Sequence, residues 1–278
     1  MGGGVRVEGA QRTLLDALDA GAPPLDAWRA YRRAHADVLD YYEEAFGAPQ
    51  EPEAQLAVSI AEQAVTLRRR ECVLALDELA PRVAQMLEVA PDAVEAVTFV
   101  AWGRAIAWCD DEHTDPRAYF ALERMPDDPI LCRAIGAHEL THLAHIRARE
   151  GDWPPWWVLG GIVAEAVAID VSRRLVPEAD PAAVMFVQPE SLSAYARERD
   201  AVHAELLGLL DVVDEATYRR AMFPATLCGG DVAGVNECGY AVADELIAAW
   251  RAAGLSPAQA ARRTPDEARA DLVALLSR

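Results

Sequence analysis

The sequence predicts an α+β fold that is predominantly helical, with a small β-hairpin or sheet placed before a long central helix. Apolar residues recur at three- and four-residue steps through the first ninety residues, which is typical of amphipathic helices. Short β-prone runs replace this pattern between residues 91 and 109, and helical spacing returns from residue 130 onward. We therefore expect a single domain over residues 1–278, in which residues 1–90 form a helical layer and residues 91–278 hold the sheet and the remaining helices.

The N-terminal layer is expected to contain three main helices. The first spans residues 25–46, where large side chains share one apolar face: Leu25, Trp28, Tyr31, His35, Val38, Leu39, Tyr42 and Phe46. A second helix is predicted over residues 55–70, and a third carries Leu76, Leu79, Val83 and Met86.

Two short runs, residues 94–102 and 105–109, are rich in residues that favour strands. Gly103-Arg104 lies between them and fits a two-residue turn with Gly at its first central position, so a β-hairpin is predicted. The acidic run 110–115 follows. It lacks the spacing and the glycine of an EF-hand loop, and we expect it to be a solvated loop.

The second half of the chain is expected to be helical. Asp128-Pro129 offers an N-cap and a first-turn proline for a helix over residues 130–149. A loop at 151–157 then leads into a helix over residues 158–174. Further helices are predicted over 191–210, 237–252 and 265–276, the last of them opened by a capping box from Thr264 to Glu267.

Composition excludes several function classes. The net charge of −19 disfavours binding to phosphate backbones or to anionic lipid, so neither a nucleic-acid partner nor a membrane partner is expected. All 26 basic residues are Arg, and the absence of Lys excludes a Walker A loop and a Schiff-base lysine. The five cysteines form no CxxC pair, and the N-terminus does not resemble a signal peptide. We expect a cytoplasmic protein with reduced thiols.

The residues His138-Glu139-Leu140-Thr141-His142 form an HExxH motif within the helix predicted over 130–149. Residues four apart share a helix face, so both imidazoles can reach one ion at about 2.0–2.1 Å. Glu139 then projects beside them toward a metal-bound water. The motif predicts that His138 and His142 are zinc ligands and that Glu139 is a catalytic base.

A catalytic zinc also needs a third protein ligand. The extended motif of the metzincins is excluded, because it requires Gly at 145 and His at 148, where this chain has His145 and Ala148. Glu165 is the better candidate, since it is a lone carboxylate in an apolar helix and such a group is costly without a partner. Small residues at 160, 161 and 164 are expected to let this helix approach the first one closely.

An HExxH motif followed by Glu on the next helix resembles the gluzincin branch of zinc peptidases. The predicted hairpin, the long helix, the ligand helix and the later pair Gly239-Tyr240 are similar to a bacterial family of predicted zinc-dependent proteases, over roughly residues 25–275. This resemblance implies a zincin-like fold in which a small hairpin or sheet precedes the two ligand helices. It also implies one Zn²⁺ per chain, held by His138, His142 and Glu165.

The implied function is zinc-dependent hydrolysis of peptide bonds in a peptide or protein substrate. Glu139 would assist the attack of a zinc-bound water, and Tyr240 would stabilise the oxyanion with His203 behind it. The strand over residues 94–102 would pair with the extended substrate. Thermolysin-like enzymes place an orienting Asp four residues after the ligand Glu. This chain has Ile169 there and Asp170 one position later, so that role is not assigned.

Alternatives remain open at this stage. The chain could be a non-catalytic zinc-site protein that binds a partner, or a metal-free helical interaction protein. His145 is expected to lie around the metal ligands or to face solvent, and His203 fits a structural role better than a catalytic one. The tryptophans at 153, 156 and 157 are expected to cap the core more readily than to line a substrate pocket. The acidic surface favours basic or neutral peptides, and the oligomeric state is unknown.

Overall fold

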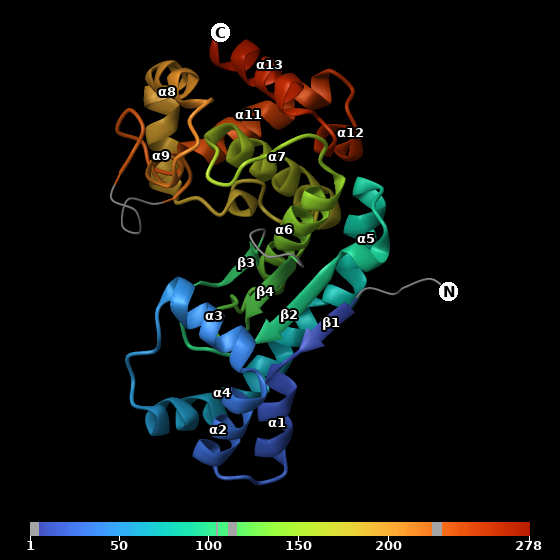
Figure 1. Ribbon diagram of the computed structural model, residues 1–278, viewed down its shortest axis with the longest axis vertical. Coiled ribbons are helices and arrows are strands. Elements are labelled where there is room, and N and C mark those ends of the chain that lie inside the picture. The colour runs from blue at the N-terminus through green and yellow to red at the C-terminus, as the bar shows by residue number, and fades with distance from the viewer. Residues whose placement is uncertain (1–5, 104, 111–115, 224–229) are drawn as a thin grey trace.

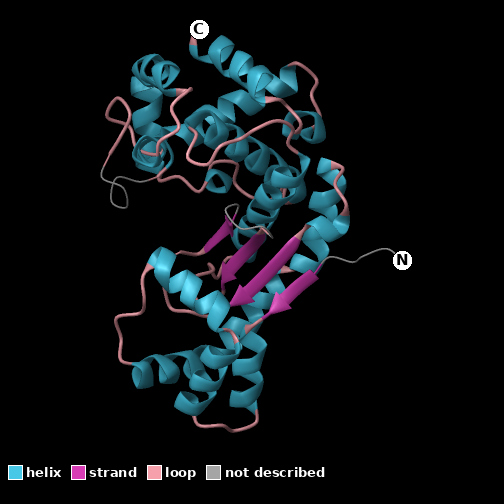
Figure 2. Ribbon diagram, viewed as in Figure 1, coloured by secondary structure: helices cyan, strands magenta, loops and turns pink. Residues whose placement is uncertain are grey.

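The computed structural model describes residues 6–103, 105–110, 116–223 and 230–278. Helices predominate, and a four-stranded sheet lies near the middle of the molecule's long axis (Figures 1 and 2). The expectation of a mostly helical α+β fold is therefore confirmed. The strands are β1 (Arg6–Gly9), β2 (Glu95–Phe99), β3 (Ala107–Asp110) and β4 (Arg117–Ala121). The first helices are α1 (Gln11–Asp19), α2 (Pro24–Ala34), α3 (Ala36–Phe46), α4 (Glu53–Leu74), α5 (Leu76–Leu87) and the short 3-10 helix η1 (Pro91–Ala93). The later helices are α6 (Pro129–Ala148), α7 (Val158–Leu175), η2 (Ala183–Met185), α8 (Pro189–Leu209), α9 (Glu215–Met222), α11 (Cys238–Ala252), α12 (Pro257–Ala261) and α13 (Pro265–Leu276).

The sheet has the order β1-β2-β4-β3, and this order contradicts the predicted hairpin. β4 lies between β2 and β3, pairing parallel with β2 and antiparallel with β3. β1 pairs parallel with β2 at the other edge, although residues 1–90 were expected to be helical. The runs 94–102 and 105–109 therefore belong to one sheet without pairing with each other. Arg104 of the expected turn, and most of the acidic loop at 111–115, lie outside the described residues.

The backbone of residues 100–102, which follows β2, makes hydrogen bonds to side chains and not to a hairpin strand. The hydroxyl of Tyr31 donates to the carbonyl of Val100 and accepts from its amide, at 3.0 Å each. The buried carboxylate of Glu123 accepts from the amides of Ala101 and Trp102 at 3.2 and 2.6 Å. These contacts satisfy the backbone groups that a hairpin would have paired, and they lead the chain away toward the edge position of β3.

The predicted N-terminal helices are found, with one break. The helix expected over residues 25–46 is interrupted at His35, whose φ of −127° and ψ of 38° are not helical, and it becomes α2 and α3. The helix predicted over 55–70 is longer at both ends, and the third becomes α5. In Figure 1, α1, α2 and α4 lie together at the end of the molecule opposite the C-terminus, while α3 lies beside the sheet.

Helices α6 and α7 form the centre of the molecule. Asp128 caps α6, its carboxylate accepting from the amide of Ile130 at 2.9 Å, and Pro129 occupies the first turn as expected. The capping box at the start of α13 is confirmed, because Thr264 and Glu267 exchange the two hydrogen bonds. Helices α9 and α12 were not anticipated. In Figure 1, α6 runs from the sheet into the group formed by α7, α8, α11 and α13.

One continuous cluster of buried apolar side chains extends from Ala10, the residue before α1, to Leu276 in α13. The sheet and both groups of helices contribute to it. Within the described ranges, no helix combines the length and the apolar composition needed to cross a bilayer.

Candidate metal centre

Three metal-ligating side chains from α6 and α7 converge on one point. The Nε2 atoms of His138 and His142 lie 2.9 Å apart. Glu165 Oε2 is 3.1 Å from His138 Nε2, and Glu165 Oε1 is 3.5 Å from His142 Nε2. Among the described residues these three form the group able to hold a metal ion, with their ligand atoms all within 4.8 Å of one another.

The distances fit a single ion. Ligands about 2.0–2.1 Å from a tetrahedral zinc lie about 3.3 Å from one another, and the three separations of 2.9, 3.1 and 3.5 Å bracket this value. The donor set of two imidazoles and one carboxylate leaves room for a fourth ligand. His138 and Glu165 are buried, at 3% and 8% exposed, and a buried carboxylate that faces two imidazole nitrogens can be compensated by a cation held between them.

The protonation states suit a metal site, because metal ligands must be deprotonated. Burial lowers the pKa of His142 to about 4, so this imidazole is neutral near pH 7. Burial alone would raise the pKa of Glu165, but the two histidines and a hydrogen bond from Tyr240 lower it overall. Burial opposes protonation of His138, and the adjacent Glu165 outweighs it and raises the pKa of His138.

Glu139 lies beside these ligands in the wall of the same cavity. Burial raises the pKa of Glu139 to about 7, with a smaller contribution from the negative charge of Glu165. A carboxylate with a pKa near the working pH can both accept and return a proton. Such a carboxylate fits the role of base that the HExxH motif predicts for Glu139.

Tyr240, from the first turn of α11, also lines the cavity. Its hydroxyl hydrogen-bonds Glu165, and burial together with the charge of Glu165 raises the Tyr240 pKa well above its usual value. The tyrosine therefore stays protonated and can donate a hydrogen bond. The structure brings Tyr240 to the metal centre, although α11 is about a hundred residues from the HExxH motif.

The cavity has a volume of about 280 Å³, and its remaining walls come from elements that the sequence analysis did not connect with the site. Ala107, Trp108 and Cys109 line it from the edge strand β3, and Tyr218 and Phe223 line it from α9 and the residue that follows. An Asp214 cap, which accepts from the amide of Thr217 at 2.8 Å, is the sequence signal that could have indicated α9.

The glycines at the start of α7 have a role different from the expected one. A Cβ on Gly161 would lie 2.5 Å from Cε2 of Tyr218, and one on Gly160 would lie 3.5 Å from the ring of Trp153. Gly161 therefore makes room for an aromatic side chain of α9 in the cavity wall. The predicted close approach of this helix to the HExxH helix is found, because α6 and α7 pack against each other, but Gly161 itself faces α9.

Of the two further candidate histidines, His145 lies in the wall of the cavity and His203 lies outside it. His145 is buried and lines the cavity one turn beyond His142. Burial lowers the pKa of His145 to about 3, and its ring hydrogen-bonds the backbone of Ala261. His203 does not lie behind Tyr240 in the site. Its Nε2 is 2.8 Å from the hydroxyl of Tyr195 and 3.5 Å from Glu245, so its contacts fit the structural role.

Other candidate residues lie away from the cavity. Trp153 donates to the carbonyl of Glu150 at 2.8 Å, and neither it nor the tryptophans at 156 and 157 line the cavity. Asp170 accepts hydrogen bonds from Arg174 and Arg251, so it does not orient a histidine ligand. Nδ1 of His138 is buried and has no hydrogen-bond partner among the described residues, which leaves the orienting role unassigned.

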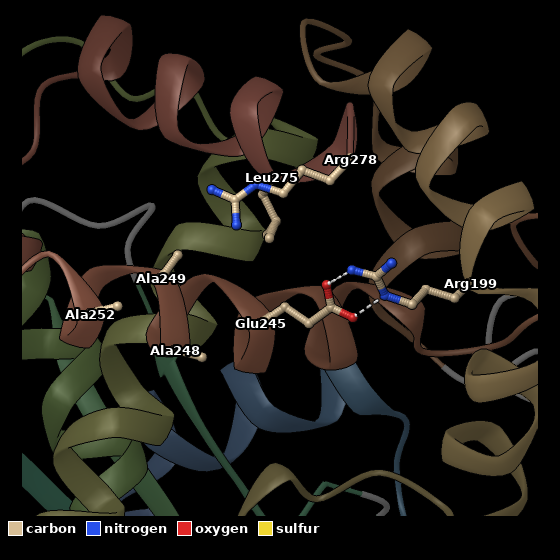
Figure 3. Close-up of a pocket in the computed structure, with 7 residues that line it drawn as sticks. All are labelled: Arg199, Glu245, Ala248, Ala249, Ala252, Leu275 and Arg278. Atoms are coloured by element: carbon tan, nitrogen blue, oxygen red, sulfur yellow. Dashed lines mark hydrogen bonds and ion pairs between the residues drawn. The ribbon is translucent and has the colours of Figure 1, made fainter.

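A second recess lies between α8, α11 and α13 (Figure 3). Its two central charged groups are already paired, because Arg199 donates to both oxygens of Glu245 at 2.7 Å each. Alanines and Leu275 form most of the rest of its wall, with Arg278 at the rim. The one side-chain carboxylate of the recess is thus engaged by Arg199 and Tyr195, and no metal-ligating group lies beside it among the described lining residues, so the metal centre is the better candidate for function.

Comparisons with protein-family models, with curated proteins and with solved structures found no match to this chain. The function must therefore be argued from the site itself.

Proposed function

We propose that the protein is a zinc-dependent metallopeptidase, a hydrolase of peptide bonds, with one zinc ion held by His138, His142 and Glu165. The observation that carries this proposal is the convergence of these three ligands in a cavity that also contains Glu139. A donor set of two imidazoles and one carboxylate is typical of catalytic zinc. A purely structural zinc normally fills its fourth position with a protein ligand, and the described residues offer none within reach.

A bound zinc ion would supply a lowered pKa for water and a polarised substrate carbonyl. The chain supplies the movement of protons. The Glu139 carboxylate accepts a proton from the attacking water and passes it to the leaving amine, a task for which a pKa of about 7 is suited.

Tyr240 is proposed to stabilise the oxyanion. Its hydroxyl stays protonated and already lies within hydrogen-bonding range of Glu165, so it can donate toward charge that develops next to the ligands. The same contact allows a second role, in which Tyr240 only orients the Glu165 carboxylate. These two roles predict different losses when the hydroxyl is removed.

The substrate is proposed to pair with β3. The sequence analysis assigned this role to residues 94–102, but β2 is an inner strand between β1 and β4 and has no free edge. β3 is an edge strand, and three of its residues line the cavity. An extended peptide can add to such an edge through main-chain hydrogen bonds.

The Glu139→Gln variant tests this proposal against a non-catalytic metal site. We expect the variant to keep its zinc and to lose at least about a hundredfold in kcat toward any peptide that the parent cleaves, because the base is removed. Glu150→Gln is the matched control, since Glu150 is exposed just beyond the end of α6. Unchanged turnover in Glu139→Gln would contradict the proposal and would favour a site in which the ion only joins the two helices.

A further inference from the structure

One face of α6 carries more than the metal ligands. His138, His142, His145 and Arg149 follow each other at spacings of four, three and four residues, so they lie in one stripe along the helix. All four line the same cavity. The stripe begins at the metal centre and ends at Arg149, the residue that follows the last turn of α6.

The distance along this stripe matches a short stretch of peptide. Arg149 is seven residues beyond His142, which is about 10 Å along a helix axis. An extended peptide advances about 3.3 Å per residue. A substrate cleaved at the metal centre and lying along α6 would therefore bring its second or third residue from the cleaved bond to Arg149.

Local charge favours an anion at this end of the cavity. Arg149 is the only arginine among the described residues that line it, and its carboxylates are Glu139 and Glu165. A divalent ion at the ligands offsets those two charges, so the described lining residues together with the ion keep the single positive charge of Arg149. The chain as a whole carries −19. At physiological salt, however, exposed charges act over only about 8 Å, so the cavity's own charges dominate for a bound substrate.

The side chains between the two ends are suited to an apolar residue. On α6, Ile146 and His145 lie between the ligands and Arg149 and line the cavity. Burial lowers the pKa of His145 to about 3, so its imidazole is neutral. The cavity thus places an apolar section next to the metal centre and a cation beyond it.

We propose that Arg149 is a specificity residue that binds a carboxylate on the substrate, about two residues from the cleaved bond. This inference rests on the proposed peptidase function and names its substrate class: peptides with an apolar residue next to the cleaved bond and an anionic group beyond it. A guanidinium has five N–H donors in a planar fork, so Arg149 can bind a carboxylate and still keep contacts within the chain. The surface charge of the whole chain led to the opposite expectation, basic or neutral peptides.

Metal-anchored dipeptide probes test this inference without requiring turnover. A hydroxamate group chelates the zinc, a following Phe occupies the apolar section, and the next residue reaches Arg149. Three probes are compared by calorimetry on the zinc-loaded protein: hydroxamate-Phe-Glu-amide, hydroxamate-Phe-Gln-amide, and hydroxamate-Phe-Gln with a free C-terminal carboxylate. The variants are Arg149→Gln and the control Arg147→Gln, whose side chain is exposed on the same helix and does not line the cavity.

We expect one of the two anionic probes to bind about tenfold or more tightly than the neutral probe. The Glu probe would identify an internal acidic side chain, and the free carboxylate would identify a C-terminus. This preference should disappear in Arg149→Gln and persist in Arg147→Gln, while binding of the neutral probe stays constant and shows that the variants are folded.

Equal binding of all three probes to the parent would overturn the inference and leave the peptidase proposal standing. The same holds for a preference that survives in Arg149→Gln. Failure of every probe to bind zinc-loaded protein would overturn the peptidase proposal, and the inference with it.

Discussion

Replacing Asp170 with Ala should weaken the contact between α7, which carries Glu165, and α11, which carries Tyr240. Asp170 is buried in α7, at 7% exposed. It accepts from Nε of Arg251 in α11 at 2.8 Å and from Nε of Arg174 in its own helix at 3.0 Å, and Nη2 of Arg251 makes a further short contact. Removing the carboxylate leaves two guanidinium groups without this partner.

The expected cost is about 2 kcal/mol in free energy of unfolding. Breaking a fully buried ion pair costs about 3–5 kcal/mol, because the remaining charge cannot be solvated. The side chains of Arg174 and Arg251 are 38% and 44% exposed, so water can replace part of the lost interaction and the cost falls below that range. Asp211→Ala is the matched control: Asp211 pairs with Arg269 of α13, and the two side chains are 60% and 47% exposed, which predicts a loss of about 1 kcal/mol or less.

Urea denaturation at pH 7, followed by circular dichroism, gives the free energies of unfolding by linear extrapolation. The prediction is a clearly larger loss for Asp170→Ala than for Asp211→Ala, with the same m-value for both. A loss below about 0.5 kcal/mol for Asp170→Ala, or equal losses in the two variants, would refute the reasoning that burial of the carboxylate decides the cost.

Three further predictions concern the site. Tyr240→Phe should lower kcat by about 10²-fold or more with zinc affinity unchanged if the hydroxyl stabilises the oxyanion; a weaker zinc affinity with little change in kcat would show that it only orients the ligand carboxylate. His145 has a pKa of about 3 when folded, against 6.5 for an unperturbed histidine, so between these values the unfolded chain binds the extra proton and acid destabilises the fold. Lowering the pH from 6.5 to 5 should reduce the free energy of unfolding by about 2 kcal/mol through this residue. The free energy of unfolding of His145→Gln should fall less over the same interval. Identical pH dependence in parent and variant would contradict this prediction. Gly161→Ala should destabilise the protein by about 1 kcal/mol, because its methyl group must displace the Tyr218 ring, whereas Gly160→Ala should be neutral or stabilising; melting curves that rank the two variants in the opposite order would show that the ring moves at no cost.

Local sequence signals were sufficient for most of the helices. α6 is expected from an Asp cap, a first-turn proline and apolar spacing, and all three act within a few residues of one another. The strand order of the sheet could not be predicted from such local signals. β1 is separated from its partner β2 by some eighty-five residues, and β4 inserts between two runs that are adjacent in sequence. Pairing over such distances depends on tertiary packing, and a short turn containing Gly103 does not determine it.

In the candidate site as well, some residues are indicated by local sequence signals and others are brought in only by tertiary packing. His138 and His142 share a helix face by spacing alone, and Glu165 is conspicuous as an isolated charge in an apolar helix. Trp108 and Tyr218 give no comparable signal, because β3 and α9 reach the cavity only through the packing of the whole chain. The position of Arg149 on the ligand stripe could be read from the sequence, but its place in the cavity wall could not.

Measuring the metal content of the protein decides whether His138, His142 and Glu165 hold a zinc ion. The parent and Glu165→Ala should be purified without chelators or a polyhistidine tag, and their zinc and iron measured by elemental analysis, because iron is also bound by two histidines and a carboxylate. We expect about one zinc per chain in the parent and a sharply lower content in Glu165→Ala. No zinc in either protein after reconstitution, or iron in place of zinc, would contradict this expectation.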